Sequence, residues 1–261
     1  MDAEVRRRNG GAVTDRDPEL RETTFRIFDT ERGGCAHAGS KGGAGILVDC
    51  GVNDARGLRP AKWLHAHGQT ASLRAIILSS QDDAYVADLE AAAALQRRAR
   101  VYVAPAALDR AAKAWPRLDL RSLDRFSESV EPLQLDFFHN EDAVDVDPRD
   151  LSVITVLRTR TLGVLLGSDI QRAGWRALLE REKFREALRT VDVLVASDNG
   201  SPSGFCAQVF EICEPRLIVL QGNRSTIDSA RVYADHASGL QFAPTGCSAR
   251  RCQPRPTARS H

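Results

Sequence analysis

IILSSQDDAYVADL, residues 76–89, is the stretch that decides the fold. The rest of the chain repeats its order of a strand, a loop and a helix. The apolar run at residues 76–78 predicts a buried strand, and helical spacing of apolar residues begins near Val86. The polar loop between them, SSQDDAY, contains two carboxylates and a tyrosine but no histidine. Enzymes place metal ligands in loops between a strand and a helix, so the composition of this loop raises the question of whether it still does chemistry.

Strands and helices alternate on both sides of this stretch. Apolar runs and alternating patterns predict strands at residues 23–30, 46–51, 75–79, 99–105, 130–139, 150–159, 162–169, 191–197 and 215–222. Helical spacing predicts helices at residues 59–68, 86–98, 106–115, 170–189, 205–213 and 225–236. The glycine-rich segment 33–45 has the composition of a hairpin-type connection. Two β-rich halves with helices predict mixed sheets between helical layers.

The composition excludes several classes of protein. The 36 basic and 35 acidic residues among 261 nearly cancel, so no net field favours nucleic acid or a membrane surface. No apolar run approaches the ~20 residues of a membrane span, and the charged N-terminus lacks the apolar core of a secretory signal. The six cysteines form no Cys-x-x-Cys pair, which predicts free buried thiols and a cytoplasmic protein.

We predict one α/β domain, residues 23–242, between two disordered ends. Residues 1–22 are charged and contain glycine, and residues 243–261 are rich in Arg, Pro and Ser without apolar periodicity. Segments of this composition do not bury enough apolar surface to offset the entropy of ordering.

The order of the elements and several short motifs resemble the metallo-β-lactamase fold, an αββα four-layer sandwich. Within it the sequence is similar to the bacterial branch related to the C-terminal domain of competence DNA-uptake channel proteins. The motifs that carry the resemblance are FRIFDTERGGC (25–35), ILVDCG (46–51), IILSSQDDAYVADL (76–89), LLGSDI (165–170) and VLVASDNGSPSGF (193–205). They match, in order, an opening strand with an Asp-x-Gly-x-Gly loop, a second strand, the main ligand motif, a Gly-Asp segment and a Ser-His-His-Gly segment.

The resemblance implies a site that holds one or two zinc ions, but the main ligand motif is altered. Its first two histidines, in the form His-x-His-x-Asp-His, are matched by Ser80 and Asp82. The motif Asp that binds the second ion and handles the proton is matched by Ala84, and the following His by Tyr85. Alanine has no donor atom and a neutral phenol is a poor zinc ligand, so we expect the second-ion half of the site to be lost.

The downstream ligand positions are altered as well. Asp169 stands at the position of the bridging Asp, while Asp198 and Asn199 replace the two histidines of the Ser-His-His-Gly segment. His236 and Asp228 are weak candidates for the final ligand. Since no histidine remains at a matched ligand position, we expect no zinc site of the family type.

Two interpretations of the remaining carboxylates stay open. In the first, Asp82, Asp169 and Asp198 converge on an oxygen-only site suited to Mg²⁺ or Mn²⁺ rather than Zn²⁺. In the second, Asp82 and Asp169 accept backbone N–H bonds at strand ends and Asp198 has drifted on the surface. We expect a structural role at the site for Asp49, which ends the second strand of the resemblance.

These residues favour a degenerate metallo-β-lactamase-like protein, without zinc hydrolase activity, that has a non-catalytic or regulatory role. The alternative is a metal-dependent hydrolase of phosphodiesters or esters that uses Asp82, Asp169 and Asp198. A third interpretation is a decaying family member, because the sequence after Gly239 has no periodicity. A protein partner fits the first hypothesis, and the resemblance implies nucleic acid or nucleotide as a further class of partner.

Overall fold

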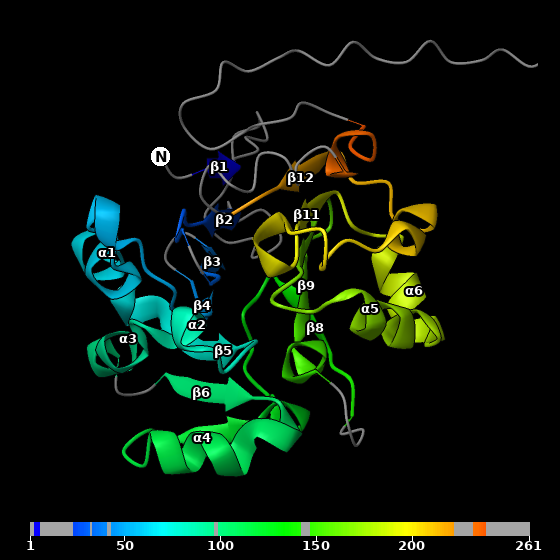
Figure 1. Ribbon diagram of the computed structural model, residues 1–261. Helices are drawn as coiled ribbons and strands as arrows, with labels where there is room; N and C mark the ends of the chain where they lie inside the picture. Colours follow the sequence, from blue (N-terminus) through cyan, green and yellow to red (C-terminus); the bar gives the residue numbers. More distant parts are fainter. Residues whose placement is uncertain are drawn as a thin grey trace, which may run out of the picture.

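The strand that opens IILSSQDDAYVADL lies inside the first of two sheets. The computed structural model (Figure 1) describes residues 3–5, 23–31, 33–40, 43–96, 99–141, 147–221 and 232–238. β5 (Leu73–Leu78) pairs in parallel with β4 (Gly45–Val48) and β6 (Arg100–Val103), and its last four residues are buried. Parallel strands covered on both faces have continuous apolar sequences, which explains the run at residues 76–78.

In the described part of the chain, seven strands form this mixed sheet in the order β1-β2-β3-β4-β5-β6-β7. Its other strands are β1 (Ala3–Val5), β2 (Thr23–Ile27), β3 (Ala36–Ser40) and β7 (Leu120–Ser122). The pairs from β1 to β4 are antiparallel, and those from β4 to β7 are parallel. The carboxyl ends of β4, β5 and β6 therefore lie at one edge of the sheet.

The second sheet has five strands among the described residues, in the order β12-β11-β10-β9-β8. They are β8 (Gln134–Phe138), β9 (Ile154–Arg158), β10 (Gly163–Leu166), β11 (Val193–Val195) and β12 (Leu217–Val219). β8, β9 and β10 pair antiparallel, and β10, β11 and β12 pair in parallel. The strands predicted at residues 150–159 and 162–169 are present as β9 and β10, which form a hairpin.

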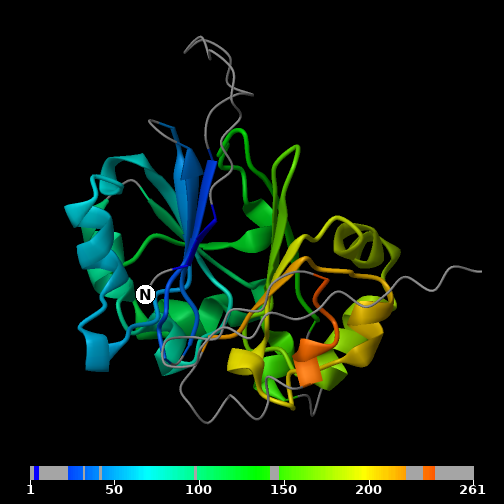
Figure 2. The same ribbon diagram turned by 90° about the horizontal axis from the view of Figure 1, so that it is seen from above.

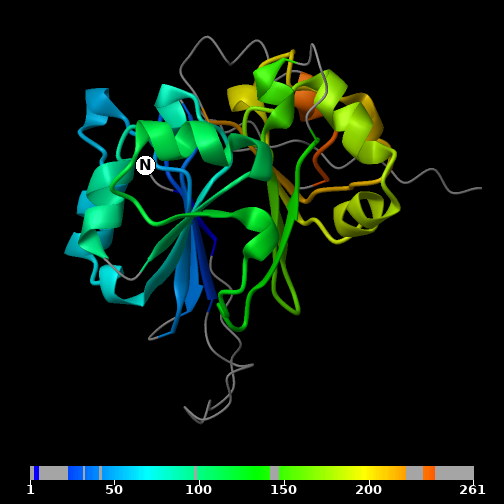
Figure 3. The ribbon, with the colours of Figure 1, turned by 90° about the horizontal axis from the view of Figure 1, so that it is seen from below.

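Helices cover the outer face of each sheet. They are α1 (Pro60–Ala66), α2 (Asp83–Val86), α3 (Leu89–Leu95) and α4 (Leu108–Ala114) on the first sheet, and α5 (Arg172–Leu179) and α6 (Glu182–Leu188) on the second. Short 3-10 helices are η2 (Asp54–Arg56), η3 (Thr70–Ser72), η4 (Pro105–Ala107), η5 (Leu123–Arg125), η6 (Pro148–Leu151), η7 (Asp198–Gly200) and η8 (Ala207–Glu211). Figures 2 and 3 show the resulting order of layers, helices–sheet–sheet–helices, which confirms the predicted four-layer α/β fold.

Apolar side chains fill all three spaces between these layers. Ile77 and Leu157 belong to the core between the sheets. Leu89 packs between the first sheet and its helices, and Trp175 and Phe184 pack between the second sheet and α5 and α6. Each fully buried Leu or Phe contributes roughly 2 kcal/mol, so the strand ends that carry the polar loops rest on a rigid scaffold. Within the described ranges, no helix has the length and apolar content that a membrane crossing requires.

The structure corrects the prediction for the glycine-rich segment 33–45. β3 (Ala36–Ser40) crosses this segment as a fully buried strand between β2 and β4. Its Ala, Gly and Ser residues have low β-propensity, so the sequence pattern indicates a connection. The small residues are needed because the backbones approach closely: a Cβ on Gly39 would lie 3.2 Å from the Cα of Gly45.

A second correction concerns the single helix predicted over residues 170–189. The structure has two helices, α5 and α6, with Arg181 in an extended conformation between them. At about 100° per residue, Trp175 and Phe184 would lie on opposite sides of one continuous helix. The break lets both rings face the same sheet, where they stack with centroids 6.0 Å apart. The helix predicted at 205–213 is likewise shorter, the 3-10 helix η8, and β7 was not predicted.

The four cysteines in the described residues, Cys35, Cys50, Cys206 and Cys213, are free and buried, which confirms the prediction for them. Cys247 and Cys252, the C-terminal segment 243–261 and most of the predicted helix 225–236 lie outside the described residues. Of the segment 1–22, the structure describes β1, which pairs with β2.

Candidate functional site

Five polar loops meet at one edge of the sandwich because each follows a strand that ends there. Parallel strands of an α/β sheet end at the same edge, where ligands commonly bind. The first residues of these loops that face the site are Asp49 after β4, Ser79 after β5, Ser168 after β10, Asp198 after β11 and Gln221 after β12. The site is therefore built from both halves of the chain.

Asp49 anchors the loop after β5. Its carboxylate accepts a hydrogen bond from the Ser79 backbone N–H at 2.8 Å and a short one from the Ser79 hydroxyl. The residue is buried, and its φ of 60° places it in the left-handed region, which Asp tolerates better than most residues. Burial raises the pKa of Asp49 to about 7, although the bonds from Ser79 oppose the shift.

Two serines join the sheets at this edge. The Ser79 Oγ lies 2.6 Å from the Ser168 Oγ. With Asp49 ionised, the single hydroxyl proton of Ser79 points to that carboxylate, so Ser168 donates to Ser79. The Ser79 carbonyl also accepts a bond from the Val153 N–H at 2.8 Å, one residue before β9. The strand end thus has a fixed position relative to the second sheet.

Asp82 acts as the N-cap of α2. Its carboxylate accepts a hydrogen bond from the Ala84 backbone N–H at 2.9 Å, and the side chain is exposed. This contact is the structural role that the second interpretation assigns to Asp82. An N-cap carboxylate satisfies one of the unpaired N–H groups of the first helical turn.

We expect Asp82→Ala to lower the free energy of unfolding by about 1 kcal/mol, because the N-cap bond is lost. The loss should be the same with and without millimolar Mg²⁺ or Mn²⁺ in urea titrations. A loss that grows several-fold when either ion is added would instead show that Asp82 holds a cation. Asp83→Ala, one residue later in the same loop, is the matched control.

Tyr85 is the residue of the loop that faces the pocket. Its side chain is 3% exposed, and its carbonyl accepts a hydrogen bond from the Cys50 N–H at 2.7 Å. The preceding turn packs against Gly33, where an added Cβ would lie 2.2 Å from the Ala84 carbonyl oxygen. Burial raises the pKa of Tyr85 well above its usual range, and the charges of Asp169, Asp49, Asp198 and Asp82 add to this effect.

Asp169 lies in a field of other carboxylates. Its side chain is 7% exposed. Burial and the charges of Asp198 and Asp82 raise its pKa to about 7, although Arg149 opposes the shift. The Arg149 guanidinium donates to Asp147 at 2.8 Å and 3.1 Å. One guanidinium therefore faces several acidic groups.

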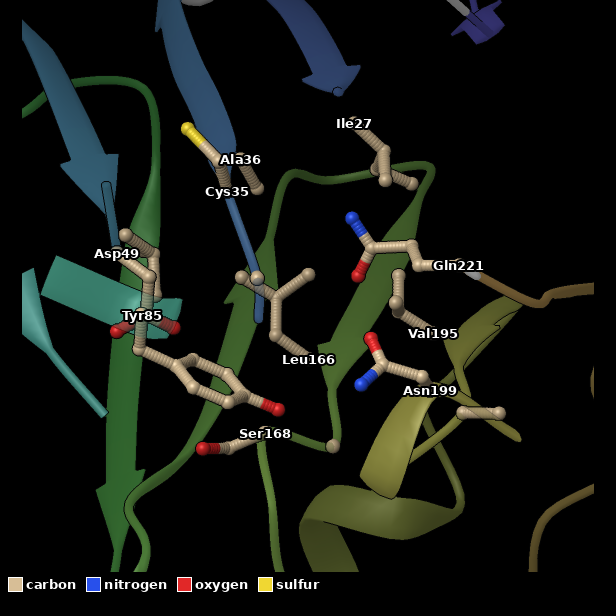
Figure 4. A pocket seen from close by; sticks show the side chains of 14 residues that line it. Ile27, Cys35, Ala36, Asp49, Tyr85, Leu166, Ser168, Val195, Asn199 and Gln221 are labelled. Atoms are coloured by element: carbon tan, nitrogen blue, oxygen red, sulfur yellow. The ribbon is translucent and has the colours of Figure 1, made fainter. Parts of the chain in front are cut away.

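Asp198 and Asn199 form a strained turn after β11. Both have positive φ, 47° and 52°, and the Asp198 N–H donates to the Ser168 carbonyl at 2.8 Å. The Asp198 carboxylate accepts hydrogen bonds from the Ser201 and Ser203 hydroxyls, each at 2.5 Å. These contacts hold the turn against the loop after β10 and leave the Asn199 side chain facing the pocket (Figure 4).

The pocket lies between the two sheets and is shallow: its empty space of about 340 Å³ is counted together with open solvent. Figure 4 shows polar side chains entering it from both halves. Its polar lining comprises Asp49, Tyr85, Ser168, Asn199 and Gln221. The remaining lining is mostly apolar, from Ile27, Cys35, Ala36, Val48, Leu166, Val195 and Ala196. A concave, largely apolar site with a few convergent polar groups is typical of small-molecule binding.

The donor set does not fit the zinc that this type of fold commonly binds. Zinc prefers imidazole and thiolate ligands, whereas hydroxyl, amide and carboxylate oxygens dominate here. In the part of the chain that the structure describes, no group of three or more His, Cys, Asp or Glu residues is arranged to hold a metal ion. The oxygen-only site at Asp82, Asp169 and Asp198 stays a prediction.

The other predicted site residues that the structure describes do not line the pocket. The Ser80 hydroxyl accepts a hydrogen bond from the Asp82 N–H at 3.2 Å, and Ala84 offers only its backbone. His236 stacks on Phe210 with ring centroids 4.5 Å apart. Asp228 lies outside the described residues.

The sequence argument missed three residues of the site, Ser79, Ser168 and Gln221. Gln221 donates to the Phe28 carbonyl at 2.7 Å and lines the pocket with the rest of its amide. All three come within two residues of the end of a strand, so a polar residue just after a predicted strand is the signal that the sequence offers for them.

Comparisons with known proteins identify the fold. No protein-family profile matches the sequence, and no curated protein matches it. Among solved structures, it is similar to the metallo-beta-lactamase fold protein YhfI from Bacillus subtilis, with 14% identity, a TM-score of 0.55, and coverage of 82% of this chain and 90% of that chain. A protein from Parabacteroides distasonis, named for an inferred metal-dependent hydrolase activity, gives 10% identity, a TM-score of 0.51, and coverage of 85% and 93%. At such identities the likeness establishes the metallo-β-lactamase-type fold alone.

Proposed function

We propose that this chain uses a metallo-β-lactamase-type fold in a non-catalytic, regulatory role and does not work as a zinc hydrolase. Tyr85 is the observation that carries the proposal. It stands at the position that the sequence resemblance matches to a ligand histidine, and its phenol projects into the pocket. Because burial and neighbouring carboxylates raise its pKa, the phenol stays neutral at physiological pH and offers no anionic ligand.

The rest of the site supports the same proposal. Zinc hydrolases need ligands that hold the ion and a group that handles the proton of the attacking water. Ala84 replaces the residue matched to the proton handler, and Asp82 is used as an N-cap. Without these catalytic groups, the site is a pocket whose polar side chains lie on fixed loops, and such a pocket is suited to binding a ligand.

A hydrolysis assay tests the proposal. Incubated with a model phosphodiester or an activated ester in Zn²⁺, Mn²⁺ or Mg²⁺, the chain should give the same rate as its Asp169→Ala variant. Turnover that depends on one of these ions and drops at least tenfold in that variant would overturn the proposal.

The second candidate function is a Mg²⁺- or Mn²⁺-dependent hydrolase that uses Asp82, Asp169 and Asp198. The observation in its favour is the electrostatic coupling of these carboxylates, since Asp198 and Asp82 both raise the pKa of Asp169. Acidic groups that act on one another in this way attract a divalent cation. This candidate requires the three carboxylates to move into a shared coordination sphere, and it predicts manganese-dependent turnover in the assay above.

In the proposed role, the chain acts in the cytoplasm through a protein partner. The free, buried thiols support the location. The closer likeness to the competence-channel branch, with nucleic acid or nucleotide as a further class of partner, rests on the sequence motifs and belongs to the proposal.

A further inference from the structure

We infer that the pocket binds a small organic cation through a primary ammonium group. The inference rests on the proposed function, because it names the ligand class of the same non-catalytic site. Three features carry it: an excess of negative charge around the pocket, the unpartnered hydroxyl of a buried tyrosine, and a lining rich in hydrogen-bond acceptors.

Negative charge surrounds the pocket. Asp49 lines it, and the charges of Asp49, Asp82, Asp169 and Asp198 all act on the Tyr85 phenol. Arg149 opposes the raised pKa of Asp169, but its guanidinium is already paired with Asp147. Carboxylates gathered without enough positive charge repel one another, so a ligand that brings positive charge relieves this repulsion, whereas an anion increases it.

The Tyr85 hydroxyl points to a ligand independently of the charges. The side chain is 3% exposed, and Figure 4 shows its hydroxyl aimed into the pocket toward Ser168 and Asn199. Among the described residues, no hydrogen bond reaches this hydroxyl. The hydroxyl stays accessible from the pocket, so a ligand bound there can reach it. A ligand N–H donor would satisfy the phenol oxygen, and the ring face adds a cation–π contribution.

The rest of the lining favours a donor-rich head group. Gln221 uses its amide nitrogen on the Phe28 carbonyl, which leaves its amide oxygen for the pocket. Asp49, Ser168 and Asn199 add further oxygen acceptors. An ammonium group has three N–H donors and fits this set. A bare metal ion fits less well, since no group of three ligand side chains is arranged to hold one in the described ranges.

Thermal unfolding of the full chain tests the inference, with methylammonium chloride as the probe and potassium chloride at equal concentration as the reference. We expect a saturable rise in Tm with methylammonium beyond the rise with potassium. Tyr85→Phe, which removes the unpartnered hydroxyl alone, should weaken the apparent affinity about two- to tenfold. Asp169→Asn should weaken it about tenfold, and Asp109→Asn, on the exposed face of α4, should leave it unchanged.

The outcomes separate this inference from the proposed function. Equal shifts with methylammonium and potassium, or a methylammonium shift that Tyr85→Phe and Asp169→Asn leave intact, would overturn the cation assignment. Either result leaves the non-catalytic role standing if the hydrolysis assay stays at the level of Asp169→Ala. Ion-dependent turnover in that assay overturns the proposed function whatever methylammonium does.

Discussion

At pH 8, Asp169→Asn should raise the free energy of unfolding by about 2 kcal/mol relative to the parent chain. Burial and the charges of Asp198 and Asp82 raise the pKa of Asp169 to about 7, so ionising it in the folded state is unfavourable. A shift of this size corresponds to about 4 kcal/mol, and we reduce the figure because solvent screens part of the carboxylate. Asparagine keeps the shape of the side chain and removes the charge.

The sign of the pH dependence makes this prediction specific. A carboxyl with a raised folded-state pKa stabilises the fold at pH values below its unfolded pKa, near 3.8, and loses that contribution as the pH rises through about 7. The advantage of Asp169→Asn should therefore be large at pH 8 and absent near pH 4 in urea titrations. The exposed Asp109→Asn is the control and should change neither value. An unchanged or lower stability of Asp169→Asn at pH 8 would contradict the account of an uncompensated acidic cluster.

His37 gives the second large effect, in acid. It lies in β3, is 2% exposed, and neither ring nitrogen has a hydrogen-bond partner among the described residues. Burial lowers its pKa from 6.5 to about 4, and the positive charge of Arg26 contributes. The unfolded chain takes up this proton as the pH falls through 6.5, whereas the folded chain resists until about 4. Folding should therefore lose about 3 kcal/mol from this residue between pH 7 and pH 4.

His37→Phe should remove this loss, because phenylalanine fills a similar space and takes up no proton. The free energy of unfolding is measured at pH 7 and at pH 4 for the parent chain and for the variant. The result is the difference between the stability that the parent chain loses over this pH range and the stability that the variant loses. His65→Gln, on the exposed face of α1, should behave as the parent chain does. Equal losses in the parent chain and His37→Phe would show that His37 is not the acid-sensitive group.

The strands with continuous apolar sequences could be predicted because burial on both faces leaves a pattern in the sequence. β5, β9 and β10 are of this kind, and their order carried the fold assignment. β3 could not be predicted, because its small residues are explained by the close approach of Gly39 and Gly45, a tertiary contact. The break between α5 and α6 follows from the spacing of Trp175 and Phe184, because nine residues at about 100° each place the two rings on opposite sides of one continuous helix.

The site could be predicted only where a residue occupies a recognisable motif position. Tyr85 and Asn199 occupy such positions, and both line the pocket. The bond between Ser79 and Ser168 joins residues 89 positions apart, so local sequence contains no signal for it. The use of Asp82 as an N-cap is local and was among the expected roles of Asp in a loop.

The zinc content of the purified chain tests the central claim most directly. After expression in zinc-supplemented medium and dialysis to remove loosely bound ions, mass spectrometry of the metal should find far less than one zinc per chain. The value should be the same in Asp82→Ala and Asp169→Ala. One zinc per chain in the parent protein, lost in both variants, would contradict the claim that this site no longer holds the metal.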